Sequence, residues 1–263
     1  MNGSPSSTRE DKALAQKVAI VTGASYGVGA AIAFALGRDG WHVACTATKA
    51  ENAKETVARI IAAGGQASAH ALDLRVQDSI EALLAEVSAS HGLVTGLVNN
   101  AGVNLRRDAV DVSRADWESV MLANLTGTFF MTQAVGRALI EAKQAGAIVT
   151  ISSSHGLLGA AQRSTYGISK AGLIQMVRML AVEWGPHNIC LNALAPGRLL
   201  TDSPSRAGSG SDAAYMANML SKIPLGRFAD IDHIAALAAL LLSPNGASIT
   251  GQVIPVDGGL SAQ

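Results

Sequence analysis

Apolar residues along the chain fall into two alternating arrangements: short runs rich in β-branched residues, and longer stretches with helical spacing. Short continuous apolar runs are typical of buried parallel strands, whereas apolar positions three and four residues apart indicate a helix packed on one side. The pattern predicts strands at 17–23, 41–47, 66–72, 93–98, 147–152, 189–195 and 252–256. It predicts helices at 28–40, 51–63, 76–91, 125–142, 164–184, 212–221 and 231–242.

Strands and helices alternate through the chain, and there is no internal repeat of fixed period. This alternation is typical of a parallel sheet with helices on both faces, and 263 residues is an ordinary length for one such domain. We therefore predict an α/β fold, a single-domain Rossmann-type doubly wound parallel sheet of about seven strands, in residues 13–263. Residues 1–12 are polar and are predicted to form a disordered N-terminus.

Two segments stand out from this alternation. Residues 196–222 begin with a stretch rich in Gly, Ser, Pro and Arg before helical spacing returns, and a loop of this length predicts a mobile substrate loop. The stretch 125–142 is apolar nearly all round, which predicts either deep burial or an oligomer interface. Shortly before it, Ser113 with Asp116 three residues later predicts a capped helix start.

The charge and cysteine content exclude several classes of protein. Lys plus Arg and Asp plus Glu balance at 20 each, so we expect neither nucleic acid nor an anionic membrane as a partner. No apolar run reaches the length of a membrane span, and the first ten residues do not form a signal peptide. Cys45 and Cys190 are too few for a disulfide framework or a metal cluster, so we expect no metal site and a cytoplasmic location.

The first candidate for chemistry is a pair of residues in the helix predicted at 164–184. Tyr166 and Lys170 are four residues apart, so they lie on one helix face, where an ammonium favours the ionised form of a phenol. Such a pair predicts proton transfer. Taken alone, the same spacing is more often a half-buried ring beside a solvated charge.

A glycine-rich turn between the first predicted strand and helix is the second candidate. Gly23, Gly27 and Gly29 let the backbone approach a phosphate closely, and the N-terminus of the following helix attracts anions. The spacing is wider than in the usual dinucleotide-binding pattern. By itself, the turn is also explained as a tight connection.

Taken together, the motifs of the chain resemble those of the short-chain dehydrogenase/reductase family. The resemblance extends from about Lys17 to Gly259, in the family's order. It implies a Rossmann-type fold and hydride transfer between a nicotinamide cofactor and a ketone or secondary alcohol. The matching motifs are Thr22-Gly23 with Gly27 and Gly29, Asp73-Leu74, Asn99-Asn100-Ala101-Gly102, Asn124, Ser153, Tyr166 with Lys170, and Pro196-Gly197.

The resemblance implies catalytic roles for four residues. Tyr166 is the general acid/base, and Lys170 assists it and binds the nicotinamide ribose. Ser153, thirteen residues before the tyrosine as in relatives, is the second hydrogen-bond donor to the substrate oxygen. Its neighbours Ser152 and Ser154 are assigned to the strand end and the turn. Asn124 orders a water between Lys170 and solvent, and its alternative role is that of a helix-kink residue.

The resemblance also implies a set of cofactor contacts. Asp73 and Leu74 border the adenine. Asn99 and Ala101 lie along the cofactor, and residues after Gly197 flank the nicotinamide. Taken one at a time, these residues are also explained as turn residues and backbone caps. The expected cofactor-binding residues are Gly23, Ser25, Tyr26, Gly27, Val28, Gly29, Thr46, Thr48, Lys49, Asp73, Leu74, Asn100, Ala101, Gly102, Tyr166, Lys170, Pro196, Gly197, Leu199 and Thr201.

The choice between NADP(H) and NAD(H) depends on the end of the second predicted strand. Selectivity for NAD(H) usually needs a carboxylate there to accept from the ribose 2′-hydroxyl, and residues 45–49 contain no acid. Thr46, Thr48 and Lys49 could instead donate to a 2′-phosphate, which favours NADP(H). Against this, Tyr26 stands where NADP-dependent relatives often carry a basic residue, and Lys49 is equally explained as a solvated charge.

The substrate pocket is expected to contain Ser153, His155, Arg163 and Arg198, near the apolar Leu157, Leu158 and Leu199. The chain is similar to 3-oxoacyl-carrier-protein reductases at residues 46–48 and 249–259. However, segments 145–147 and 186–188 lack the arginines with which such relatives bind an acidic carrier protein.

Three functions therefore remain. An NADP(H)-dependent oxidoreductase that interconverts a small-molecule ketone and a secondary alcohol comes first, and a 3-oxoacyl-carrier-protein or CoA reductase is the alternative. A non-catalytic NADP-binding regulatory protein is less favoured, because the catalytic residues are intact. The apolar helices at 125–142 and 164–184 predict self-association, as a homotetramer if the family resemblance holds.

Overall fold

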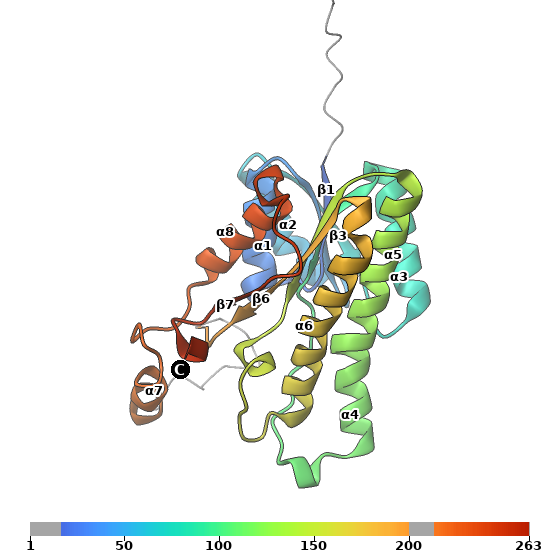
Figure 1. The fold of residues 1–263 in the computed structure, drawn as a ribbon. Coiled ribbons are helices and arrows are strands. Elements are labelled where there is room, and N and C mark those ends of the chain that lie inside the picture. The colour runs from blue at the N-terminus through green and yellow to red at the C-terminus, as the bar shows by residue number, and fades with distance from the viewer. Residues whose placement is uncertain (1–16, 200–212, 263) are drawn as a thin grey trace, which may run out of the picture.

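The structure is a computed structural model that describes residues 17–199 and 213–262. Seven parallel strands form one sheet in the order β3-β2-β1-β4-β5-β6-β7 (Figure 1). The predicted doubly wound α/β fold is confirmed, and each predicted strand is present. The strands are β1 (Val18–Val21), β2 (His42–Ala47), β3 (Gln66–Ala71), β4 (Val94–Asn99), β5 (Gly146–Ile151), β6 (Ile189–Pro196) and β7 (Val253–Val256).

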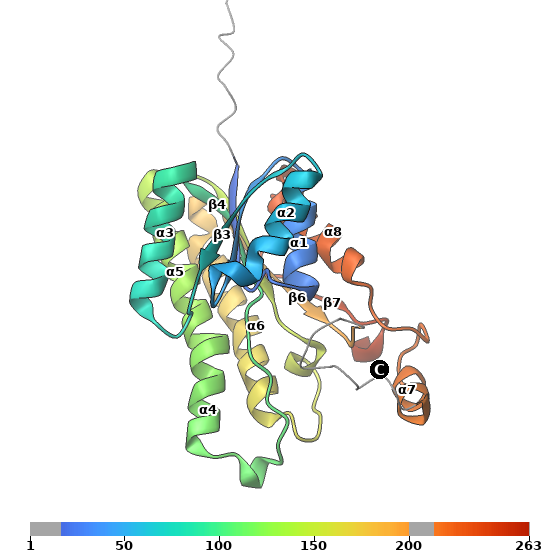
Figure 2. The ribbon, with the colours of Figure 1, turned by 180° about the vertical axis from the view of Figure 1, so that it is seen from behind.

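Helices cover both faces of the sheet. They are α1 (Gly27–Arg38), α2 (Lys54–Ala62), α3 (Gln77–His91), α4 (Arg114–Met121), α5 (Gly127–Ala142), α6 (Ser164–Trp184), α7 (Ala213–Leu220) and α8 (Ile231–Leu242). Helices α1, α2 and α8 lie on one face, and α3, α5 and α6 lie on the other (Figure 1, Figure 2). Because both faces are covered, every residue of β1 and β2 is buried, including the polar His42 and Thr46 of β2.

The strand order reverses at the centre of the sheet, since β1 pairs with β2 on one side and with β4 on the other. Ligands of open α/β sheets bind beyond the carboxyl ends of the strands at such a reversal. The glycine-rich turn follows β1, Asn100 follows β4, and Ser152 follows β5. The fold therefore brings the predicted cofactor and catalytic motifs to one edge of the sheet.

Helices α4 and α5 form one continuous rod, interrupted by a single π turn at Leu122–Thr126. The rod begins with the predicted capping box, in which the Ser113 side chain accepts from the Asp116 main-chain N–H. Within α5, Met131, Val135 and Leu139 are buried in the core. Phe130 stays exposed, so the nearly continuous apolar character of this helix is only partly explained by burial within the chain.

A cluster of three histidines lies between β2, β3 and α3. The rings of His42 and His91 stack with their centroids 3.6 Å apart, and His42 Nε2 lies 3.0 Å from Ser68 Oγ. The same hydroxyl lies 2.7 Å from His70 Nε2, and His70 Nδ1 lies 3.0 Å from Glu86 Oε1. Burial, together with the neighbouring His91 and His70, lowers the pKa of His42 to about 4.

We expect acid to destabilise the protein through His42. The unfolded chain protonates this imidazole near pH 6.5, whereas the folded protein resists protonation down to about pH 4. The free energy of unfolding therefore falls as the pH drops through this window. Urea unfolding should show a shallower pH dependence for His42→Gln than for wild type, and the exposed His233→Gln should behave as wild type. Equal slopes for all three would contradict this assignment.

Some predicted features lie outside the described residues: the polar segment 1–12, Thr201, and residues 200–212 of the predicted substrate loop. The helical spacing predicted at 212–221 is confirmed as α7. Cys45 and Cys190 are both free. Among the residues that the structure describes, no helix is long and apolar enough to cross a bilayer, and no group of side chains is arranged to hold a metal ion.

Candidate active site

The catalytic candidates meet where β5 ends and α6 begins. The end of β5 leads directly into Ser153, and a short helical turn then carries His155. The His155 ring packs edge-on against Tyr166 of α6, with the ring centroids 6.1 Å apart, and its Nδ1 lies 3.4 Å from Ser153 Oγ. Ser153 and Tyr166, which the sequence separates, are thus both neighbours of one imidazole ring.

Lys170 is buried beneath the tyrosine. Its side chain is only 4% exposed, its Nζ donates to the Ile151 carbonyl over 2.8 Å, and this ammonium lies 5.8 Å from the centre of the Tyr166 ring. Burial lowers the pKa of Lys170, and the nearby Tyr166 opposes that shift. Within the described ranges, no acidic side chain pairs with Lys170. Its ammonium therefore acts electrostatically on Tyr166 and on any ligand bound beside that residue.

Asn124 sits in the π turn and is fully buried. Its Oδ1 accepts from the Val103 N–H at 2.7 Å, while its Nδ2 donates to the Val103 carbonyl at 2.9 Å and to Ser169 Oγ at 3.1 Å. A Cβ on Gly102 would lie 3.0 Å from Asn124 Oδ1 and 3.7 Å from Lys170 Nζ. The side-chain amide therefore fastens the loop after β4 to α6, directly beside the buried lysine.

Sequence reasoning missed two of these partners. Ser169 Oγ donates to the Tyr166 carbonyl at 2.7 Å while accepting from Asn124, so it links the tyrosine's own helix turn to the π turn. A serine three residues after the tyrosine was a local signal for this bond. The Ile151 carbonyl that holds Lys170 has no signal in the sequence, because every residue has such a group.

The hydroxyl group of Ser152 is already used within the protein, since it donates to the Lys170 carbonyl at 2.9 Å. Ser154 is buried at the start of the turn that contains His155. Ser153 differs from both, because its Oγ accepts only from the His155 N–H and otherwise lies beside that residue's ring. Of the three serines, Ser153 is the one whose hydroxyl lies beside His155, the residue whose ring packs against Tyr166.

The glycine-rich turn has the geometry of a phosphate cradle. Gly23 and Gly27 have positive φ angles of 65° and 59°, and a Cβ on Gly29 would lie 2.3 Å from the Gly23 carbonyl oxygen. Tyr26 precedes α1 without capping it by its side chain, so the first N–H groups of the helix remain available to an anion. A Cβ on Gly27 would meet nothing within 4 Å, which leaves space in front of the turn. These features fit the pyrophosphate of a dinucleotide.

Thr22 at the end of β1 and Asn100 at the end of the neighbouring β4 hold this turn by hydrogen bonds. Asn100 Nδ2 donates to the carbonyls of Thr22 and Gly23 at 3.1 and 2.9 Å. Thr22 Oγ1 in turn accepts from the main-chain N–H groups of Asn100 and Ala101. Asn100, Ala101 and the glycine-rich turn therefore form one unit.

The side chain of Asn99 is used within the core. It is 3% exposed, and its Nδ2 donates to Thr132 Oγ1 at 2.8 Å and to Thr150 Oγ1 at 3.3 Å. The side chain therefore joins β4, β5 and α5, and the expectation that Asn99 lies along the cofactor stays a prediction for its main chain.

Thr46 also needs correction as a surface donor to a 2′-phosphate. It is 0% exposed, and its hydroxyl finds no partner in the part of the chain that the structure describes. Side chains alternate along a strand, and Thr46 shares the face of β2 that carries Ala44 into the core. Thr48 and Lys49 are exposed just beyond the strand, so of the three predicted donors these two are accessible from solvent.

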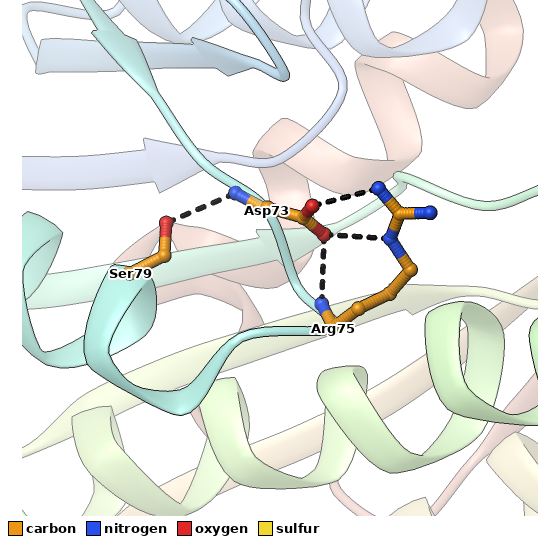
Figure 3. Close-up of polar contacts among 3 residues, drawn as sticks. All are labelled: Asp73, Arg75 and Ser79. Carbon is orange, nitrogen blue, oxygen red and sulfur yellow. Dashed lines mark hydrogen bonds and ion pairs between the residues drawn. The ribbon is translucent and has the colours of Figure 1, made fainter.

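Where the sequence predicts the adenine, Asp73 follows β3 and forms a two-pronged ion pair with Arg75 (Figure 3). This pair lowers the pKa of the Asp73 carboxyl, chiefly through the side-chain hydrogen bonds from Arg75. Leu74 is buried, and a Cβ on Gly127 would lie 2.2 Å from its carbonyl oxygen, so α5 packs directly against this connection. The sequence predicted Asp73 and Leu74 here and missed Arg75.

The predicted substrate residues are distributed over three segments. Arg163 immediately precedes α6 and donates to Asn104 Oδ1 at 2.5 Å, which ties the start of α6 to the loop after β4. Arg198 follows β6, and its guanidinium stacks over Phe228 at 5.6 Å. Gly197 donates to the Val256 carbonyl, which fixes the turn of Pro196-Gly197 against β7. The structure brings His155 together with Ser153 and Tyr166, whereas Arg198 packs on a separate loop.

Comparison with known proteins gives consistent matches over nearly the whole chain. The profile of a family described as enoyl-(acyl carrier protein) reductase matches residues 23–261. A D-threitol dehydrogenase from Mycolicibacterium smegmatis is 38% identical over 246 residues, which cover 92% of this chain and 92% of the relative. A 3-oxoacyl-[acyl-carrier-protein] reductase from Aquifex aeolicus is 38% identical over 249 residues, which cover 93% of this chain and 97% of the relative.

Among solved structures, a provisionally assigned 2-deoxy-D-gluconate 3-dehydrogenase from Agrobacterium tumefaciens, with bound NADP, superposes with a TM-score of 0.87. It is 34% identical, and the match covers 95% of this chain and 98% of that one. The chain therefore belongs to the short-chain dehydrogenase/reductase family and is an oxidoreductase that acts on CH–OH and C=O groups with a nicotinamide cofactor.

Proposed function

We propose that the protein is an NADP(H)-dependent enzyme that interconverts a ketone and a secondary alcohol, with Tyr166 as general acid/base. The observation that carries this proposal is the burial of Lys170, without an acidic partner among the described residues, 5.8 Å from the tyrosine ring. A buried ammonium favours negative charge beside it, which is the charge that a tyrosine acquires when it gives up its proton.

In this proposal the four catalytic candidates have complementary roles. When bound, the nicotinamide supplies or accepts the hydride. Tyr166 Oη gives its proton to the oxygen of the ketone, and Ser153 Oγ donates a second hydrogen bond to the same oxygen. Lys170 stabilises the tyrosinate left behind and binds the nicotinamide ribose, and Asn124 orders a water that returns a proton from solvent.

The preference for NADP(H) rests on the end of β2. Thr48 and Lys49 are exposed there, and no carboxylate occupies residues 45–49. A ribose 2′-phosphate would meet a cation and a hydroxyl at this place, whereas a 2′-hydroxyl would find no acidic acceptor. The NADP bound by the Agrobacterium tumefaciens structure is consistent with this preference.

The wild-type enzyme is expected to show a lower KM for NADPH than for NADH, and Lys49→Glu should reverse that order. A carboxylate at residue 49 repels the 2′-phosphate and accepts from a 2′-hydroxyl, so the ratio of kcat/KM for the two cofactors should shift by about tenfold or more. Lys54→Glu is the matched control, because Lys54 is exposed nearby and lies 3.8 Å from Glu51. A wild-type preference for NADH would refute the assignment.

The substrate is a ketone or secondary alcohol, and the names of the relatives point to different substrates within this class. One is named for a polyol and another for a 3-oxoacyl-carrier-protein, and the family profile carries an acyl-carrier name as well. We favour a small ketone or alcohol, since segments 145–147 and 186–188 contain no arginine. A panel of polyols, ketones and 3-oxoacyl thioesters, assayed with both cofactors, tests this choice, and a thioester that outperforms all others would establish the alternative.

We further propose that the enzyme is a homotetramer. Large apolar side chains are exposed on both predicted self-association helices: Phe130 on α5, and Ile168, Met179 and Val182 on α6, of which Val182 is the extreme case at 81% exposed. Sedimentation at micromolar concentration should show a tetramer, and Val182→Glu should shift it toward smaller species because a charge opposes burial. Val110→Glu, at a residue 93% exposed outside these helices, is the control that should stay assembled. A monomeric wild type would contradict the proposal.

A further inference from the structure

The Ser153 hydroxyl is held in place by the turn that follows it. Ser153 has an extended backbone and caps the short helical turn at Ser154–Gly156, so its Oγ accepts from the His155 main-chain N–H at 3.2 Å. The ring of the same residue brings its Nδ1 to 3.4 Å from this Oγ. His155 therefore contacts the serine hydroxyl both through its main chain and through its side chain.

The path of this turn does not depend on the imidazole. A Cβ on Gly167 of α6 would lie 2.9 Å from the His155 carbonyl oxygen, and a Cβ on Gly156 would lie 2.9 Å from the Lys170 carbonyl carbon. Glycines at both places let the main chains of the turn and of α6 touch directly. A change of the His155 side chain therefore leaves the Ser153 Oγ where the main chain holds it and removes only the contact with Nδ1.

The protonation of this ring nitrogen decides where the Ser153 hydroxyl proton points. A hydroxyl has one hydrogen and two lone pairs, and the His155 main-chain N–H takes one lone pair. If Nδ1 carries a hydrogen, it takes the second lone pair, and the Oγ hydrogen is left for a ligand. If Nδ1 carries none, the Oγ hydrogen turns toward the ring, and the serine presents a lone pair to the ligand instead.

We propose that His155 is a positioning residue that keeps a hydrogen on Nδ1 and thereby directs the Ser153 hydroxyl proton at the substrate oxygen. The inference rests on the proposed ketone reduction, in which that oxygen gains negative charge as the hydride arrives. Such an oxygen needs donors, so only the form of the ring with a hydrogen on Nδ1 serves the reaction. The edge-on contact with Tyr166 restrains the ring, and hydrogen bonds of catalytic groups often shorten from lengths such as 3.4 Å when a substrate binds.

The test compares two substitutions of His155 in steady-state ketone reduction with NADPH. An Asn amide nitrogen lies two bonds from Cβ, as Nδ1 does, so His155→Asn can still donate to Ser153 and should keep kcat within about threefold of wild type. His155→Phe keeps a ring against Tyr166 without a donor, so kcat should fall by about tenfold, the effect of one lost hydrogen bond. The KM for the ketone should change little, because the charge that this bond stabilises develops only in the transition state.

A second measurement places His155→Phe in a Ser153→Ala background. Because His155 acts through the serine hydroxyl, the substitution should then lower kcat by less than about twofold further. A role in packing against Tyr166 would persist in this background, since the tyrosine is still there. His187→Phe is the matched control, because His187 is an exposed histidine on the turn after α6, and it should leave kcat at the value of each background.

The inference is overturned if His155→Phe keeps the kcat of wild type, or if His155→Asn loses as much activity as His155→Phe. An equal loss in the Ser153→Ala background would also overturn it, because the ring would then act on the tyrosine alone. A rise in kcat for His155→Phe would show that Nδ1 competes for the serine proton, which is the opposite arrangement. Failure of wild type to reduce any ketone with either cofactor would instead refute the proposed function, and this inference with it.

Discussion

Tyr166→Phe is expected to lower kcat for ketone reduction by about 10²–10⁴-fold, the range that general acid catalysis contributes. The substitution removes the proton donor and keeps the ring that packs against His155. The dissociation constant for NADPH should change little, because the phosphate cradle lies on the glycine-rich turn after β1. Steady-state assays together with fluorescence titration of the cofactor separate these two effects.

Thr165→Val provides the matched control for this experiment. Thr165 precedes the tyrosine, is 2% exposed, and its Oγ1 has no hydrogen-bond partner among the described residues. Valine has nearly the same shape, so the variant removes a hydroxyl next to the catalytic one without opening a cavity. It should keep wild-type turnover. Undiminished turnover by Tyr166→Phe would assign the proton to another group.

Lys170→Met is expected to lower kcat by about 10²-fold or more while leaving the urea midpoint at or above the wild-type value. Activity falls because the tyrosinate loses the ammonium beside it. Stability does not fall with it, since burial disfavours the charged lysine and methionine fills a similar volume without charge. The Ile151 carbonyl loses its donor, at a cost of about 1–3 kcal/mol, which is less than the several kcal/mol needed to desolvate an ion.

The control for this variant is Lys54→Met, which removes an exposed ammonium that lies near Glu51. Neither kcat nor the urea midpoint should change. If Lys170→Met instead unfolded at much lower urea than wild type, the lysine would be a structural residue first. The contrast between activity and stability is therefore the diagnostic measurement, and activity alone would not decide between the two roles.

The sequence was sufficient for the architecture because both faces of the sheet are covered. Strands buried on two sides are mostly apolar, so β1 appears as a continuous apolar run and β2 as an apolar run broken only by His42 and Thr46. The boundaries were less certain. The predicted helix at 51–63 begins in the structure with a 3-10 turn at Ala50–Ala53 before α2 (Lys54–Ala62).

The site was only partly predictable, and the failures have local causes. Thr46 is buried like every other residue of β2, because helices cover both faces of the sheet, so its position within a central strand was enough to predict its burial. Asn124 forms hydrogen bonds with Val103 and Ser169, which are 21 and 45 positions away from it in the sequence. No local sequence pattern predicts such bonds. The ion pair between Arg75 and Asp73 joins residues only two positions apart. It depends on the rotamers of both side chains, which the sequence does not specify.

The hydrogen bonds between the Asn124 side chain and the Val103 main chain affect how readily the loop after β4 opens locally. Val103 lies in a surface loop and its side chain is 44% exposed, yet its N–H is bonded to the amide of a fully buried residue. Amide hydrogens exchange with solvent only when their bonds open, and groups bonded to the same core open together. The N–H of Val103 should therefore exchange as slowly as those of α6, which makes this loop part of the same cooperative unit as the helix that carries Tyr166 and Lys170.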